Sequence, residues 1–152
     1  MGSNMGNSQQ QLLIAIKNIT QQIGIVVRKS KLYTTAAWGN TNQPNFLNQV
    51  IVVETKRTAL QTIDIILNIE KKMGRVRTTK NAPRTIDIDI LFFNKEIIAT
   101  KQLTVPHPQI ENRRFVLTPL NELSPNFKHP ASYKTIHQLL NDCTDMLAVK
   151  KF

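Results

Sequence analysis

The sequence predicts a mixed α/β (α+β) domain with a ferredoxin-like core, and three observations support this prediction. The chain has 152 residues, of which 41% are hydrophobic, so one domain spanning residues 1–152 can bury a sizeable core. Helical and strand patterns follow one another in the order α-β-β-α-β as far as residue 93. One strand placed before this order gives the β-α-β-β-α-β arrangement of the ferredoxin-like fold.

The first helix is predicted to run from Ser8, a suitable N-cap, to Gly24, which ends it. The first strand of the core is expected to be missing from this chain, because the sequence starts at Met1-Gly2-Ser3, where the first turn of that core belongs. Residues 25–34 are predicted as a strand. Residues 46–55 form the clearest strand, with side chains alternating between two faces.

Thr58 is predicted to cap a second helix, which Gly74 ends. A basic loop then leads into a third strand at residues 86–93. Four further elements are predicted beyond it: a short strand near residues 97–98, a Pro-rich turn at 105–109, a helix at about 114–123, and a last helix starting near Ser132.

The net charge of +10 favours a polyanionic ligand, which leaves nucleic acid, an anionic membrane and a phosphorylated small molecule open. No apolar run is long enough to span a bilayer, and no signal peptide is expected. Cys143 is the only cysteine, so no internal disulfide can form. These features lead us to expect a cytoplasmic protein.

Two carboxylates interrupt the predicted strand at 86–93. Asp87 and Asp89 are two residues apart, so they share a face, with α-carbons about 6–7 Å apart. Such a pair repels itself unless a cation lies between, and Mg²⁺ prefers oxygen ligands of this kind. The pair therefore predicts a metal site, in which two Mg²⁺ ions could be held together with a polyphosphate. The simpler alternative is an exposed strand face with solvated charges.

Arginines cluster just before these carboxylates. Arg75, Arg77 and Arg84 fall in or beside the basic loop, and guanidinium groups match phosphate oxygens bidentately. A metal pair together with arginines suits phosphoryl transfer, because negative charge spreads over the transferred oxygens.

Other candidate residues carry weaker signals. Each has an ordinary structural alternative: His107 as a turn residue, Arg113 as a solvated cation, and Trp38 as a cap on the core. Phe46 and Asn48 share a strand face and offer a ring to stack on and an amide to hydrogen-bond, although core and sheet-edge roles are the more common ones for such residues.

Five segments taken together resemble 6-hydroxymethyl-7,8-dihydropterin pyrophosphokinases of folate biosynthesis. They are GSNMGN (2–7), NQPNFLNQV (42–50), GRVR (74–77), PRTIDIDIL (83–91) and LTVPHPQIENRRFVLTPLNELSP (103–125). The resemblance covers nearly the whole chain. It implies a ferredoxin-like fold and transfer of pyrophosphate from ATP to the hydroxymethyl group of a reduced pterin, releasing AMP.

The resemblance also implies roles for individual residues. Asp87 and Asp89 would bind two Mg²⁺ ions, and Arg75 and Arg84 would contact the phosphates and assist the chemical step. Residues implied at the nucleotide site are Glu70, Arg77, Ile90, Thr104, His107 and Arg113. Residues implied at the pterin site are Thr35, Ala36, Trp38, Phe46, Asn48 and Phe115, with the two phenylalanines on either side of the ring.

The sequence departs from the family pattern in places. Asn81-Ala82 stands where the family usually has Trp-Gly, and the hydrophobic strand that precedes GSN in the family is absent. These departures leave open a weakened relative that retains pterin binding. The positive charge leaves open a second alternative, a basic nucleic-acid-binding module on the same core. We expect small-molecule substrates, a monomer, and neither nucleic-acid nor membrane partners.

Overall fold

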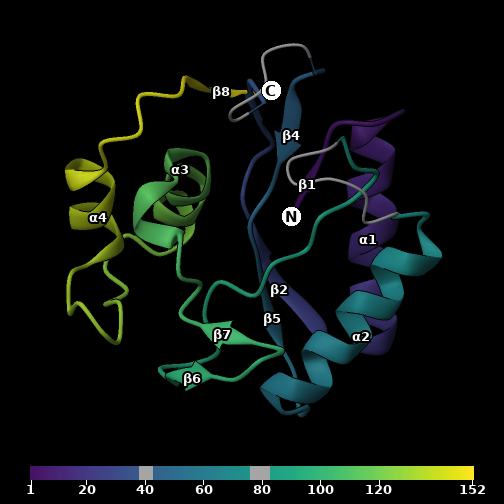
Figure 1. Ribbon diagram of the computed structural model, residues 1–152, viewed down its shortest axis with the longest axis horizontal. Helices are drawn as coiled ribbons and strands as arrows, with labels where there is room; N and C mark the ends of the chain where they lie inside the picture. Colours follow the sequence, from purple (N-terminus) through teal and green to yellow (C-terminus); the bar gives the residue numbers. More distant parts are fainter. Residues whose placement is uncertain (38–42, 76–82) are drawn as a thin grey trace.

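A computed structural model of the chain describes residues 1–37, 43–75 and 83–152. It has three layers (Figure 1). Helices α1 (Ser8–Gln22) and α2 (Ala59–Lys72) cover one face of the strands, and α3 (Arg114–Leu123) and α4 (Ile136–Asp142) lie on the opposite side. The mixed α/β prediction is confirmed, and so is the position of α3. No helix in the described ranges is long and apolar enough to cross a membrane.

The central sheet has the strand order β1-β4-β3-β8, and all its pairs are antiparallel. Its strands are β1 (Gly2–Ser3), β3 (Tyr33–Thr35), β4 (Phe46–Asn48) and β8 (Val149–Lys151). Asp87 extends the sheet beyond β1, because Gly2 N donates to Asp87 O at 2.9 Å and Asp87 N donates to Gly2 O at 2.8 Å. The order from Asp87 through β1 and β4 to β3 is that of a ferredoxin-like core, which confirms the predicted fold class. The first strand, predicted to be missing, is present as the two residues of β1, because Gly2 and Ser3 pair with β4 on one side and Gly2 bridges Asp87 on the other.

Both long strands predicted in the first half are each divided in two. Residues 25–34 form β2 (Ile25–Lys29) and β3, and residues 46–55 form β4 and β5 (Ile51–Glu54). The breaks coincide at Ser30 and Gln49, where side chains replace part of the ladder. Gln49 Nε2 donates to Ser30 O at 2.7 Å, and Val50 N donates to Ser30 Oγ at 3.1 Å. Strands β2 and β5 therefore form a separate two-stranded sheet.

The strand predicted at residues 86–93 is wrong beyond its start. Only Asp87 forms a bridge, and residues 88–93 continue without a strand partner among the described residues. The reason is that β1, its neighbour, pairs through Gly2 and Ser3 and contributes no residue opposite this continuation. Further on, β6 (Ile98–Ala99) and β7 (Thr104–Val105) form a small hairpin.

The helix starts follow local capping chemistry. Thr58 caps α2 as predicted, with Gln61 completing a capping box. Asn7, not Ser8, caps α1, because its side chain accepts from Gln10 N at 3.0 Å. The last helix begins at Ile136 and not near Ser132, because Thr135 and Gln138 form a second capping box.

The hydrophobic core has two main parts. One lies between α1, α2 and the strands and includes Leu12, Ile69 and Ile86. The other lies between α3, α4 and the sheet and includes Leu117 and Ile136. The functional candidates lie at the edge between these two parts, where the sheet reaches Asp87.

Candidate active site

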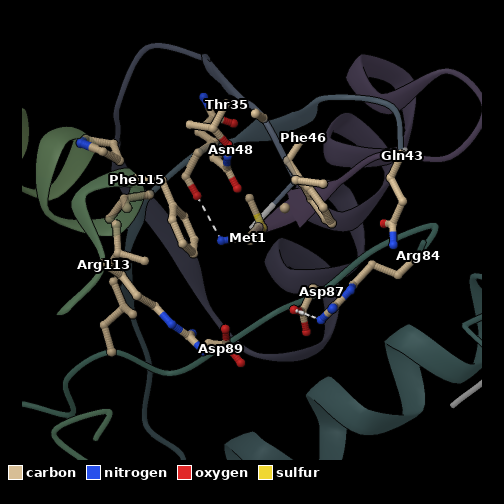
Figure 2. Close-up of a pocket in the computed structure, with 18 residues that line it drawn as sticks. Met1, Thr35, Gln43, Phe46, Asn48, Arg84, Asp87, Asp89, Arg113 and Phe115 are labelled. Carbon is tan, nitrogen blue, oxygen red and sulfur yellow. Dashed lines mark hydrogen bonds and ion pairs between the residues drawn. The ribbon is translucent and has the colours of Figure 1, made fainter. Parts of the chain in front are cut away.

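A pocket of about 130 Å³ opens where β1, β3 and β4 meet residues 84–91 and the start of α3 (Figure 2). It brings together residues predicted from distant parts of the chain, which are Thr35, Ala36, Phe46, Asn48, Arg84, Asp87, Asp89, Arg113 and Phe115. The predicted pterin residues and the predicted phosphate and metal residues therefore border one cavity.

Asp87 lies between two arginines on the polar side of this pocket. Arg75 NH1 is 2.6 Å from Asp87 Oδ1, and Arg84 NH1 is 2.5 Å from Asp87 Oδ2. All three side chains are largely buried, with exposed fractions of 15% for Arg75, 21% for Asp87 and 22% for Arg84. Low exposure strengthens these pairs relative to surface salt bridges. Both oxygens of Asp87 are thus engaged by groups that are also suited to phosphate.

Asp89 differs from Asp87 in its surroundings. Its side chain is exposed at the mouth of the same pocket, and no described cation lies within ion-pair distance of it. Arg113 extends toward it from the α3 side (Figure 2). The described residues contain no cluster of three or more metal-ligating side chains. The carboxylates of Asp87 and Asp89 are oxygen donors of the kind that a hard cation such as Mg²⁺ prefers.

Glu70 links helix α2 to this polar side. Its Oε1 accepts from Ile88 N at 2.7 Å and also pairs with Arg75. Burial raises the pKa of the Glu70 carboxyl, while the Ile88 N–H and Arg75 act in the opposite direction. Glu70 thus fixes both the backbone between the two aspartates and one of the arginines that hold Asp87.

Two phenylalanines stand on opposite sides of the apolar part of the pocket (Figure 2). Phe46 comes from β4, and Phe115 comes from the first turn of α3. Each carries a guanidinium 5.8 Å from its ring centroid, Arg84 over Phe46 and Arg113 over Phe115. The aromatic and cationic groups are therefore interleaved, and a flat ligand between the rings would lie beside the arginines.

The buried amide of Asn48 has a defined orientation. Its Nδ2 donates to Thr35 Oγ1 at 3.0 Å, so its Oδ1 points toward the pocket. Gly2 lies under this oxygen, and a Cβ added at Gly2 would meet Oδ1 at 2.8 Å. The pocket floor thus offers an oriented carbonyl acceptor whose place depends on the absence of a side chain at residue 2.

The remaining predicted residues are distributed more widely. His107 follows β7, and burial lowers its pKa, with Arg113 adding to this effect and Asp89 opposing it, so it lies near both. Ile90 packs against the core and borders a different cavity. Thr104 is exposed on β7. Trp38 and Arg77 lie outside the described residues.

Asn4, which was not predicted as a site residue, joins two sides of the site. Its buried side chain donates to Gln43 Oε1 and to Pro44 O, both at 3.3 Å, and accepts from Arg84 N at 2.9 Å. Asn4 therefore ties the segment before Phe46 to the arginine that holds Asp87. Its place within GSNMGN was a signal for it, but its partners lie too far along the chain to be inferred.

Met1 was not predicted either. Its ammonium donates to Gln49 O at 2.9 Å, and it borders the pocket between the two phenylalanines (Figure 2). Burial lowers the pKa of this amine, although Asp89, Asp87 and Glu70 act to raise it.

Comparison with known proteins identifies the group to which these features belong. The sequence profile described as "7,8-dihydro-6-hydroxymethylpterin-pyrophosphokinase (HPPK)" matches residues 1–125. A protein of Aquifex aeolicus named 2-amino-4-hydroxy-6-hydroxymethyldihydropteridine pyrophosphokinase is 40% identical over 138 residues, which cover 91% of this chain and 86% of that protein. A protein of the same name from Haemophilus influenzae is 35% identical over 151 residues, covering 99% and 94%.

The fold agrees with this assignment. A crystal structure of HPPK-DHPS in complex with substrates superposes with a TM-score of 0.72 at 18% identity, covering 93% of this chain and 42% of the other. At this identity the superposition supports the fold alone. On the sequence matches, the chain belongs to the 7,8-dihydro-6-hydroxymethylpterin pyrophosphokinase family.

Proposed function

We propose that this chain transfers pyrophosphate from ATP to the hydroxymethyl group of 6-hydroxymethyl-7,8-dihydropterin and releases AMP. One observation carries the proposal. A single pocket has facing aromatic rings and an oriented amide on one side, and two carboxylates with arginines on the other. The first side suits a flat heterocycle with hydrogen-bonding edges, and the second suits a polyphosphate.

In this proposal the pterin ring lies between Phe46 and Phe115. The Asn48 Oδ1 acceptor, oriented by Thr35, takes a hydrogen bond from the ring edge. Ala36 lies at the pocket rim, and the role proposed for Trp38 stands on the resemblance alone. Aromatic stacking tolerates any planar ring, so the directional hydrogen bond at Asn48 supplies the selectivity.

The nucleotide is assigned to the polar side. Arg75 and Arg84 bind the phosphates, and Arg113 and His107 approach the same region. Ile90, Thr104, Arg77 and Glu70 complete the proposed nucleotide set. Asp87 and Asp89 would hold two Mg²⁺ ions. Such ions, when bound, neutralise phosphate charge and position the reacting groups.

The chemical step is an in-line displacement. The pterin hydroxyl oxygen attacks the β-phosphorus as it loses its proton, and the bond to the α,β-bridging oxygen breaks, so AMP leaves with that oxygen. The arginines stabilise the charge on the transferred oxygens, and the pocket holds the two substrates in reacting orientation. No side chain needs to form a covalent intermediate.

The test is AMP formation from Mg-ATP and the hydroxymethyl pterin. Asp89→Ala should lower the rate at least about 100-fold, because a group that stabilises developing charge is lost. Asp64→Ala is the matched control, because it removes an exposed carboxylate on α2 that does not line the pocket, and it should keep wild-type activity. Full turnover by Asp89→Ala would refute the metal assignment. Pterin binding without AMP formation in the wild type would favour the weakened relative.

A further inference from the structure

The two walls of the pterin pocket are contributed by separate layers of the molecule. Phe115 belongs to α3, whereas Thr35 and Asn48 belong to the central sheet. The distance between these walls decides whether a flat ring fits between them. Whatever joins the start of α3 to β3 therefore influences the pocket.

The adjacent residues Arg113 and Arg114, at the start of α3, make contacts in different directions. Arg113 lines the pocket, whereas Arg114 binds residues near the C-terminus. Arg114 Nε donates to Asp145 O at 2.6 Å, and its NH2 donates to Cys143 O at 3.0 Å. In return, Asp145 Oδ2 accepts from Arg114 N at 3.0 Å.

Asp145 thereby acts as the cap that α3 lacks locally. The N-cap residue, Arg113, makes no side-chain capping hydrogen bond. A carboxylate that accepts from a first-turn N–H satisfies an orphan donor and interacts favourably with the helix dipole. The Asp145 side chain also accepts from Leu147 N at 3.0 Å through Oδ1, so the same group fixes the course of the chain beyond it.

That chain then joins the other wall. Strand β8 pairs with β3, with Val149 opposite Thr35 and Lys151 opposite Tyr33, and Phe152 N donates to Leu32 O at 2.9 Å. Thr35 in turn orients Asn48. Residues 143–152, which we name the C-terminal strap, are thus anchored to the first turn of α3 at one end and to the pocket strand at the other (Figure 1).

The opposite end of α3 has its own attachment to the sheet. Glu122 Oε2 accepts from Tyr33 OH at 2.8 Å and from Lys31 N at 3.2 Å. Burial and the Glu122 carboxylate raise the pKa of Tyr33 to about 12, so this phenol stays a donor at physiological pH. This contact fixes the C-terminal end of the helix, whereas the strap acts at the end that carries Phe115.

We propose that the C-terminal strap sets the separation of the two pterin-binding walls, and that Asp145 is its positioning residue. The inference rests on the proposed pterin site. Asp145 touches neither substrate and acts through Arg114 and the first turn of α3. Loss of its contacts leaves Phe115 free to move relative to Asn48, which weakens pterin binding more than nucleotide binding.

The test compares Asp145→Ala with Asp145→Asn in the full-length chain by steady-state kinetics. Asp145→Ala should raise the KM for pterin about five- to tenfold, the range expected for loss of a helix cap, with the KM for ATP and kcat within about twofold of wild type. Asp145→Asn keeps one acceptor oxygen for Arg114 N but turns an NH2 group toward Leu147 N, so its pterin KM should lie between those of wild type and Asp145→Ala. Asp142→Ala is the matched control and should match wild type, because it removes an exposed carboxylate at the end of α4 that pairs only with Lys134 among the described residues.

A chain ending at Leu147 tests the other end of the strap independently, because it lacks β8 but keeps Asp145. If circular dichroism shows it folded, its pterin KM should also rise. A pterin KM within twofold of wild type in Asp145→Ala overturns the proposal, and so does an equal rise in both KM values. Failure of the proposed function would look different, because the wild type itself would then form no AMP.

Discussion

The two ends of the strand layer differ in how they are closed. At the pocket end, pairing is continuous from Asp87 through β1, β4 and β3 to β8. At the other end, β5 pairs with β2 alone among the described strands, and a cavity of about 360 Å³ separates it from residues 88–93. Apolar side chains dominate the cavity wall, including Ile51, Val53, Ile88 and Phe92.

This difference separates two requirements: precise placement of the binding side chains at the pocket end, and overall stability at the other end. Binding side chains need exact placement, and the pocket end supplies it through a fully paired backbone. The open end leaves apolar surface in contact with a cavity, which costs stability. The two cavities share Met1, Val50, Asp89 and Leu91 in their walls, whereas the two phenylalanines and Asn48 line the pocket alone. Changes at the two ends should therefore act mainly on different measurements.

Filling the cavity should have the largest effect on stability. A variant extended ahead of Met1 by Val-Thr-Val-Ile-Val can place a strand between β5 and residues 88–93, because Met1 lies at the cavity edge and continues the line of β1. Burying these side chains should raise Tm by about 5–10 °C. A Gly-Ser extension of equal length is the control. Equal melting temperatures for the two variants, by differential scanning calorimetry, would show that the cavity accepts no strand.

Adding a side chain at the pocket end should weaken pterin binding rather than lower stability. Gly2→Ala puts a methyl group 2.8 Å from Asn48 Oδ1, and the buried amide cannot move without losing its bond to Thr35. We expect about tenfold weaker pterin binding, comparable to the loss of one well-placed hydrogen bond. Isothermal titration calorimetry measures this affinity directly.

Gly6→Ala is the control at a nearby glycine, because nothing lies within 4 Å of the Cβ that it adds. Its positive φ of 62° makes a small loss of stability expected, but pterin affinity should stay unchanged. Unchanged pterin affinity in Gly2→Ala would contradict the oriented acceptor.

The smallest expected effect is a change in the pH dependence of stability, through His129, which packs against Phe92 in the wall of the larger cavity. His129 packs edge-on against Phe92, and its Nδ1 accepts from Ala131 N at 3.2 Å and from Ser132 N at 3.1 Å. Burial lowers its pKa, and Glu111 opposes this only in part.

The folded state therefore binds fewer protons than the unfolded state just below pH 6.5, the ordinary pKa of histidine. Stability should then rise with pH through that window and become level above it. His129→Asn should flatten the profile measured by urea unfolding between pH 5 and 8, leaving the share of His107, whose pKa is lowered as well. A profile identical to that of wild type would exclude His129 as a contributor.

Local chemistry explains what was predictable in the fold. The capping box at Thr58 and the helical spacing of α1 involve residues three or four apart, so they can be read directly from the sequence. The strand breaks at Ser30 and Gln49 could not be read in this way. They depend on hydrogen bonds between residues 19 and 20 positions apart, which replace a regular ladder that periodicity alone would predict.

The same division holds for the candidate site. The shared face of Asp87 and Asp89 follows from strand periodicity, and both line the pocket. Asn4 and Asp145 escaped prediction, because Asn4 acts on partners 39 to 80 positions away and Asp145 caps a helix that begins 31 positions earlier. A polar side chain that hydrogen-bonds groups far away in the sequence leaves no pattern among its sequence neighbours from which its role could be predicted.

The pairing of Asp87 with both Arg75 and Arg84 affects how a phosphate and a metal ion would bind together. Under the proposed function, a polyphosphate that binds Arg75 and Arg84 would take both counter-charges from the aspartate and leave it facing further negative groups. A cation bound at Asp87 at the same time would offset this cost. The proposed site would therefore favour nucleotide and metal bound together over either one alone.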